Sequence, residues 1–310
     1  MRGKSTNVAI FGAAILALSL AGPALAADAP VAVKAPIMKA AAPPPSPIYQ
    51  LAFGISVSND YNFRGVSQSN RDWSFGGYAE GRYNSPYGQW YLGVAGWRID
   101  WPGLSTPYGF TDPSAEVDFF GGWRHTWDKA SVDIGLIYYY YPGETFNGFT
   151  SDSDFWEIYW KGGYAVSDKL SVGANLFYSP DVLNYSETFA SAAYGGFSAK
   201  ASGIYGSLTA AYTFWQKDDW KSVVSGELGH WWLKGTGFTA GGYVDPDYTY
   251  WNAGLAFTYK TVTLDLRYHG TSQSVAECTS FLLSAVGNPS NKWCNDAYIA
   301  TLKFDMTLPN

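Results

Sequence analysis

Long apolar runs and charged side chains are both scarce in this 310-residue chain. Beyond the N-terminal region, no apolar run approaches the roughly 18 residues that a membrane-spanning helix needs, which excludes a helical membrane protein. Charged residues make up 15% of the chain, whereas an ordinary soluble domain has about 25%. Aromatic residues, in contrast, reach 18%. Such a chain has too few charges to cover a water-soluble surface of the usual kind.

Basic residues are outnumbered, with 20 Lys and Arg against 26 Asp and Glu, and this balance argues against nucleic acid as a partner. Histidine is rare, and His125, His230 and His269 fall in separate predicted strands. No metal-ligand cluster or phosphate-binding glycine loop accompanies them, so we expect no metal and no cofactor. The stretch YHGTSQS around His269 and Ser272 lacks a nucleophile signature, so no catalytic residue and no enzyme activity are predicted.

The N-terminus carries the features of an exported protein. Two basic residues precede the apolar run 8–20, and Ala24-Leu25-Ala26 then supplies the small residues that a signal peptidase reads. An Ala- and Pro-rich stretch follows, which is typical of an extended linker of polyproline character. We therefore expect a signal peptide at 1–26, a linker at 27–48 and a folded domain at 49–310.

Cysteine is nearly absent. Cys278 and Cys294 are the only two, and both follow the last predicted strand but one, in a single long connection. Because an exported chain meets an oxidising compartment, we predict a disulfide between them. It would restrain that connection.

From residue 49 onwards the chain repeats segments of about ten residues in which large apolar and polar side chains alternate, the pattern of a strand with one apolar face. Trp156, Ile158 and Trp160, for example, share one face, while Glu157 and Lys161 share the other. We predict twelve strands, at 49–58, 72–84, 89–99, 116–127, 131–141, 155–166, 170–179, 203–215, 221–233, 248–259, 261–269 and 296–308.

The breaks between these segments alternate in length. Short breaks lie near 85–88, 128–130, 167–169, 216–219 and 260, and long ones near 59–71, 100–115, 142–154, 180–202, 234–247 and 270–295. An up-and-down antiparallel sheet with tight turns at one end and long loops at the other is typical of an outer-membrane barrel. Closure of the sheet into a barrel lets neighbouring strands supply hydrogen-bond partners for the backbone N–H and C=O groups, which lipid cannot do. We therefore predict an all-β transmembrane barrel of about twelve strands, whose short turns face the periplasm.

The two faces of the predicted strands differ in chemistry. A charge that faces hydrocarbon near the midplane costs about 2–4 kcal/mol, so the charged residues are expected inside. They either pair across strands and plug the lumen or line a water-filled channel. Arg98 has the wrong parity for the inside, so it lies either at the rim or beyond a bulge. The residues expected in the lumen are Glu80, Arg82, Asp118, Arg124, Asp133, Glu157, Lys161, Glu227, Asp265, Arg267, Lys303 and Asp305.

Tryptophans cluster near the ends of the predicted strands. An indole ring with an apolar body and a polar tip suits the interface between hydrocarbon and headgroups, so these residues are candidates for two aromatic girdles. The candidates are Trp73, Trp90, Trp123, Trp127, Trp156, Trp160, Trp215, Trp220, Trp231, Trp232 and Trp251.

The region 54–83 carries the motifs Ser58-Asn59-Asp60-Tyr61, Phe63-Arg64-Gly65 and Ser67-Gln68, followed by a glycine-rich strand. In these residues the chain resembles the TorF family of porin-like proteins, a conserved proteobacterial family. The stretch WYLGVAGWRID from Trp90 is similar to the next block of that family. The resemblance implies an outer-membrane barrel and passive transport, and it supplies no catalytic residues. Within the motif, we expect Asp60 and Arg64 to brace the first long loop.

The pattern and the resemblance together predict a porin-like channel for small hydrophilic solutes in the outer membrane of a Gram-negative bacterium, with a weak preference for cations. The alternatives are a structural or adhesive barrel with a plugged lumen, an outer-membrane lipid hydrolase and a secreted soluble sandwich. As partners, we expect outer-membrane lipid, lipopolysaccharide, the barrel-assembly machinery and the solutes themselves. The channel is expected to be either a monomer or a homo-oligomer.

Overall fold

The computed structural model describes residues 47–101, 110–111, 113–146, 153–184, 200–236, 247–274 and 293–309. The predicted signal peptide and all but the last two residues of the predicted linker lie outside these ranges. In the described residues the chain is all-β apart from one 3-10 turn, η1 (Val182–Asn184), and the twelve long strands close into an antiparallel barrel. None of the described segments forms a helix that is long and apolar enough to cross a membrane.

The barrel confirms the predicted fold class, and every strand boundary lies within a few residues of its predicted position. The barrel strands are β1 (Tyr49–Ser58), β4 (Ser74–Ser85), β5 (Gly88–Arg98), β7 (Ala115–Trp127), β8 (Ala130–Tyr140), β10 (Phe155–Ala165), β11 (Leu170–Ser179), β12 (Lys200–Lys217), β13 (Trp220–Thr236), β14 (Tyr248–Tyr259), β15 (Val262–Thr271) and β16 (Ala297–Leu308). Two short pairs, β2 (Asn62–Phe63) with β3 (Val66–Ser67) and β6 (Phe110–Thr111) with β9 (Thr145–Phe146), stand apart from the barrel sheet.

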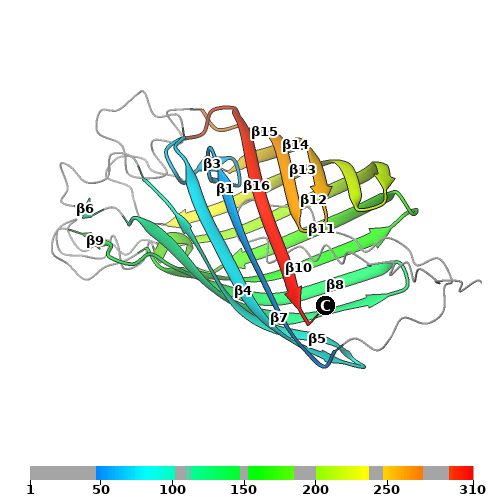
Figure 1. The fold of residues 1–310 in the computed structure, drawn as a ribbon. Coiled ribbons are helices and arrows are strands. Elements are labelled where there is room, and N and C mark those ends of the chain that lie inside the picture. Colours follow the sequence, from blue (N-terminus) through cyan, green and yellow to red (C-terminus); the bar gives the residue numbers. More distant parts are fainter. Residues whose placement is uncertain are drawn as a thin grey trace, which may run out of the picture.

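Each barrel strand pairs with its sequence neighbours among the barrel strands, and β16 pairs with β1 to close the sheet. The closing register places Ser56 opposite Lys303 and Gly54 opposite Asp305. Figure 1 shows the barrel from the side, with its strands inclined to the axis and the short turns gathered at one end. Tight turns at that end begin with residues of positive φ, such as Asp128, Asp218 and Lys260, which matches the twist that short hairpins require.

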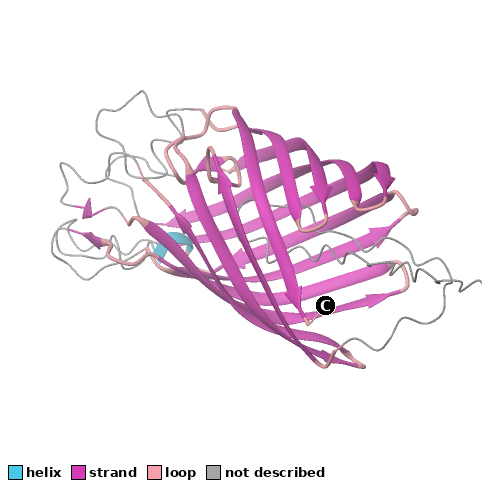
Figure 2. Cartoon of the chain, in the orientation of Figure 1, coloured by secondary structure: helices cyan, strands magenta, loops and turns pink. Residues whose placement is uncertain are grey.

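Strand alternation separates the two faces of the barrel. Large apolar side chains on the outer face stay exposed, for example Leu92 at 72% and Leu208 at 67%. A contiguous apolar belt of this kind is a liability in water and suits a hydrocarbon surrounding. Figure 2 shows that nearly all the described structure is strand, joined at the short-turn end by tight turns.

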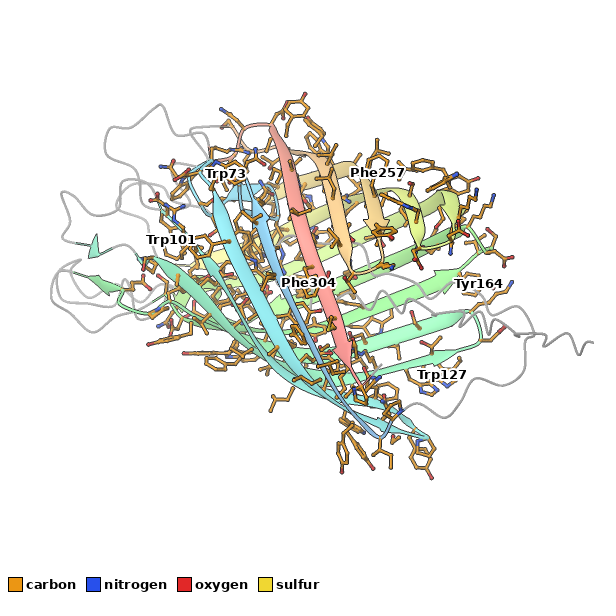
Figure 3. The ribbon with its side chains drawn as sticks, in the orientation of Figure 1. Trp73, Trp101, Trp127, Tyr164, Phe257 and Phe304 are labelled. Atoms are coloured by element: carbon orange, nitrogen blue, oxygen red, sulfur yellow. The ribbon has the colours of Figure 1, made fainter. Side chains whose placement is uncertain are left out.

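Aromatic side chains mark both ends of the outer face. Trp73 lies at the long-loop end, and Trp127 and Tyr164 lie at the short-turn end (Figure 3), and all three are exposed. One predicted girdle residue is wrong. Trp231 is only 3% exposed and belongs to the buried interior, because it shares strand parity with the buried Glu227, whereas Trp232 faces outwards.

Arg98 is the last residue of β5, and the pairing of β5 with both neighbours runs without a register shift. Its guanidinium donates to the carbonyl of Trp73 and pairs with Asp72 and Asp100, both at 3.4 Å. Of the two alternatives, Arg98 therefore lies at the rim. The register shift that the structure does contain falls in β12, between Thr213 and Trp215.

Candidate functional site: the barrel lumen and its inner hairpin

One wall of the lumen carries a cluster of charges in the half next to the short turns. The buried carboxylate of Glu80 accepts hydrogen bonds from Arg82 and Arg124. Asp133 stands directly opposite Arg124 on β7 and Lys161 on β10. Because each charge has an opposite charge beside it, this part of the wall is polar yet close to balanced.

The opposite wall repeats this arrangement with other residues. Arg267 donates to Asp265 at 3.0 Å, to the side-chain oxygen of Asn252 at 2.6 Å and to Ser225 at 2.9 Å. Further round the barrel, Tyr78 donates to Asp305 at 3.0 Å. These side chains are buried or half-buried, and they extend the polar lining around the lumen.

Aromatic rings on the inner face lie against glycines of neighbouring strands. A Cβ added at Gly229 would stand 2.2 Å from the hydroxyl of Tyr205, and one at Gly135 would stand 2.4 Å from that of Tyr159. Phe120 covers Gly93 in the same way. Since only glycine leaves this space, the rings can pack along the wall instead of projecting across the lumen.

The connection between β1 and β4, residues 59–73, reaches across the lumen at the long-loop end, where Arg64 pairs with Glu157 on β10. Within it, β2 and β3 form a hairpin whose two turn residues, Arg64 and Gly65, have φ values of 47° and 90°. Positive φ at both positions is the signature of a type I′ turn. A Cβ on Gly65 would lie 3.0 Å from Thr271 and 3.1 Å from Tyr250, so the turn sits directly against the barrel wall. We call β2, β3 and this turn the inner hairpin.

Arg64, at the tip of the inner hairpin, is 1% exposed. Its two terminal nitrogens donate to the two carboxylate oxygens of Glu157 on β10, each at 2.9 Å. Tyr139 on β8 donates to the same carboxylate at 3.0 Å. A bidentate, buried pair of this kind is strong because both hydrogen bonds are charge-assisted and little water competes with them.

Four aromatic rings surround the same guanidinium. The Cζ atom of Arg64 lies 4.6 Å from the ring centroid of Phe63, 4.7 Å from that of Phe177, 4.3 Å from that of Tyr205 and 4.7 Å from that of Trp231. Phe63 belongs to the hairpin, and the other three rings come from β11, β12 and β13. Arg64 is therefore held by strands on the far side of the lumen from β1 and β4.

Two acidic residues of β7 lie beside the hairpin. Glu116 accepts hydrogen bonds from Tyr61 at 2.5 Å and from Tyr141 at 3.0 Å. Asp118 is fully buried, and within the described part of the chain neither of its oxygens has a hydrogen-bond partner. With Glu157, these residues make the long-loop half of the lumen acidic.

The base of the 59–73 connection is fastened by Asp60. Its carboxylate accepts hydrogen bonds from Ser67, Ser69 and Arg71 at 2.5, 3.0 and 3.0 Å. Burial raises the pKa of the Asp60 carboxyl above its usual value, while the hydrogen bonds from Ser67 and Ser69 and the charge of Arg71 partly oppose that shift. Burial and the neighbouring Glu116 and Asp118 also raise the pKa of the Tyr61 hydroxyl.

The structure brings the predicted lumen residues together on the inner face, but in two groups. Asp118 and Glu157 belong to the long-loop half, and Glu227 lies between the halves, where it accepts from Tyr205 at 3.1 Å. The short-turn half holds the rest, namely Glu80, Arg82, Arg124, Asp133, Lys161, Asp265, Arg267, Lys303 and Asp305. Asp60 accepts hydrogen bonds from within the first long connection, and Arg64 of the same connection pairs with Glu157 on β10 and not with β1 or β4. Their expected bracing role stays a prediction.

Sequence reasoning missed several residues that hold the hairpin. Glu116 has the same parity as Asp118 but falls at the very start of its strand, and Trp231 shares parity with Glu227. Parity alone could have placed both inside. Tyr61 and Phe63 carried no such signal, because the 59–73 connection has no strand periodicity.

The predicted disulfide stays a prediction, because Cys278 lies outside the described residues. Cys294 is buried, and its Sγ lies 3.2 Å from the side-chain oxygen of Gln273. The histidines do not come together. His125 stacks on Trp123 and His230 contacts Thr249, whereas His269 contacts Tyr250 in the interior.

Residues 41–301 match the model of a family described as "Bacterial protein of unknown function (Gcw_chp)", and the chain belongs to this family. The description does not use the TorF name, so that resemblance stays a prediction. No curated protein matches the chain.

Solved structures with a similar fold include three barrels. The COG4313 outer membrane channel from Pseudomonas putida F1 is 11% identical, with 86% of this chain and 99% of that chain covered and a TM-score of 0.47. The NanC porin is 10% identical, with 84% of this chain and 98% of that chain covered and a TM-score of 0.42. LpxR from Salmonella typhimurium is 10% identical, with 82% of this chain and 99% of that chain covered and a TM-score of 0.40. Similarities this distant do not indicate what the chain does.

Proposed function

We propose that this protein is a channel in the outer membrane of a Gram-negative bacterium, through which small hydrophilic solutes diffuse when the inner hairpin leaves the lumen. The observation that carries the proposal is the inner wall of the short-turn half. It is lined by charged side chains of both signs, such as Asp133 and Lys161, that stay partly exposed to the lumen. A barrel that only had to be filled could replace such charges by apolar residues without loss of stability.

The outer face supports the membrane setting. Its exposed apolar belt and the aromatic residues at both ends fit a bilayer and its two interfaces. The long connections would then face the cell exterior and the short turns the periplasm. Tags inserted after Asp168 should be labelled only in permeabilised cells, whereas a tag within 180–202 should be labelled on intact cells. Labelling at Asp168 on intact cells would reverse this orientation.

The proposed selectivity is a weak preference for cations, which would arise at the long-loop end. There Glu116, Asp118 and Glu157 lie near one another, and Arg64 leaves with the hairpin. The short-turn half, in contrast, pairs most of its acidic residues with bases. Reversal potentials across a salt gradient would report the preference, and strong selectivity for anions would contradict it.

A second candidate function is a structural barrel whose lumen is permanently plugged. The burial of Arg64 favours it, because a closed hairpin blocks passage. Planar-bilayer recordings separate the two. We expect rare openings in the native protein and frequent ones when the hairpin is disabled, whereas a well-folded hairpin variant without conductance would indicate the structural role.

A further inference from the structure

Four residues of the barrel wall surround the guanidinium of Arg64, which belongs to the inner hairpin. Glu157 supplies a carboxylate that takes both terminal nitrogens of Arg64, and Phe177, Tyr205 and Trp231 place their rings within 4.3–4.7 Å of its Cζ atom. All four wall residues lie on barrel strands, so their positions do not depend on the inner hairpin. We call these four residues the guanidinium cage.

Neighbouring groups hold each part of the cage in place. Tyr139 donates to the Glu157 carboxylate at 3.0 Å, and Tyr205 donates to Glu227 at 3.1 Å while its ring covers Gly229. The indole of Trp231 lies over Gly203, where a Cβ would come within 2.6 Å of Nε1. A site whose side chains are fixed by their own surroundings binds without a large ordering cost.

The chemistry of the cage selects one class of ligand. A planar guanidinium can stack on aromatic faces and present two parallel N–H groups to a carboxylate at the same time, whereas an ammonium is a compact point charge that makes no such fork. The two equal distances of 2.9 Å to Glu157 show that the cage fits the fork.

We propose that the guanidinium cage is a binding site for alkylguanidinium solutes and that Arg64 is its tethered occupant. A solute that takes the cage from the long-loop end displaces Arg64 and releases the inner hairpin. The release step rests on the proposed channel, whereas the binding step does not. Because Arg64 is tethered, it competes at an effective concentration on the order of millimolar, which keeps the hairpin closed until such a solute is abundant.

Calorimetric titration of the purified full-length protein in detergent micelles tests the binding step. Ethylguanidinium is the probe, and ethylammonium is the control of equal charge. The Arg64→Ala variant should bind ethylguanidinium at least about tenfold more tightly than the native protein, because the tethered competitor is gone. Arg98→Ala removes an arginine at the rim and should bind as the native protein does. The double variant Arg64→Ala/Glu157→Gln should lose the binding.

Three results would overturn the site: Arg64→Ala binds no more tightly than Arg98→Ala, the double variant keeps the affinity, or ethylammonium binds as well as ethylguanidinium. If Arg64→Ala does not fold, Arg64→Lys takes its place. Its ammonium is a poorer occupant of the cage, so ethylguanidinium should still bind more tightly than to the native protein, and equal binding would refute the proposal.

Planar-bilayer recordings of the native protein test the release step. Ethylguanidinium added on the long-loop side should raise the open probability, and ethylammonium at the same concentration should not. Binding to Arg64→Ala without conductance in any variant would contradict the channel and support the site. Conductance in Arg64→Ala without binding would contradict the site and support the channel. Currents that do not respond at concentrations where calorimetry shows the native cage occupied would refute the release step.

Discussion

The two halves of the lumen differ in how they are filled. In the short-turn half, acidic and basic side chains of the wall pair with one another across strands, as Glu80 on β4 and Arg124 on β7 do at 2.6 Å. In the long-loop half, the wall is acidic and aromatic, and the matching base, Arg64, comes from a hairpin that is not part of the barrel sheet. The first half is complete as a wall, whereas the second half is complete only when the hairpin is in place.

This difference indicates where the protein can change state. Removing the inner hairpin leaves the hydrogen-bonded barrel intact, since β1 and β4 pair directly from Tyr49 to Ser58. It would, however, expose the carboxylate of Glu157 and three aromatic rings. In the proposed channel, the barrel would be the rigid element and the hairpin the movable one, which is the division that a gated channel needs.

The largest effect should come from disabling the hairpin. The combined substitutions Phe63→Gly, Arg64→Ser and Val66→Gly remove the side chains that contact the wall, so single-channel recordings should show conductance at least several-fold above that of the native protein. A matched variant at the other end, Asp128→Gly with Lys129→Ser, changes a short turn and should leave conductance unchanged. Equal conductance in all three proteins would show that the hairpin does not close the lumen.

Breaking the ion pair alone should cost stability. Arg64→Ala leaves the carboxylate of Glu157 buried without its base, and the loss of one partner of a buried pair typically costs about 3–5 kcal/mol. Arg98→Ala breaks exposed pairs at the rim and should cost about 0–1 kcal/mol. Urea unfolding of both variants and of the native protein in detergent, followed by tryptophan fluorescence, measures the loss of unfolding free energy in each variant. A similar midpoint for both would mean that Arg64 is not held as tightly as its geometry indicates.

The barrel and the charged residues of its inner face were predictable from the sequence, whereas the contacts of the inner hairpin were not. The strands could be predicted because large apolar side chains alternate with polar ones along each of them, so Glu157 and Trp156 could be assigned to opposite faces from parity alone. The inner hairpin has no such pattern. Arg64 and Glu157 are 93 positions apart in the sequence. Only the closed three-dimensional structure brings β10, β11, β12 and β13 around the Arg64 side chain.

Glycine positions on the inner wall should be sensitive to small additions. In Gly229→Ala the new methyl would collide with the hydroxyl of the fully buried Tyr205, and overpacking of this kind costs about 1–3 kcal/mol. In Gly81→Ala the methyl finds its nearest neighbour at 3.8 Å, so this variant is the control. The midpoint temperature of thermal unfolding should be lower for Gly229→Ala than for Gly81→Ala. The reverse order would mean that the rings do not depend on the glycines.

Charge in the short-turn half should tune selectivity without affecting closure. Asp133→Asn removes the acid that stands opposite Arg124 and Lys161. Arg124 keeps its hydrogen bond to Glu80, but the net charge of this wall becomes more positive, so the reversal potential should shift modestly towards anions. Asp168→Asn lies in an exposed turn between β10 and β11 and should shift it less, because bulk salt screens that position. The open probability should stay that of the native protein in both variants, since neither touches the hairpin. A change in open probability in Asp133→Asn would show that the two halves of the lumen are coupled. The short-turn half could then no longer be treated as independent of the inner hairpin.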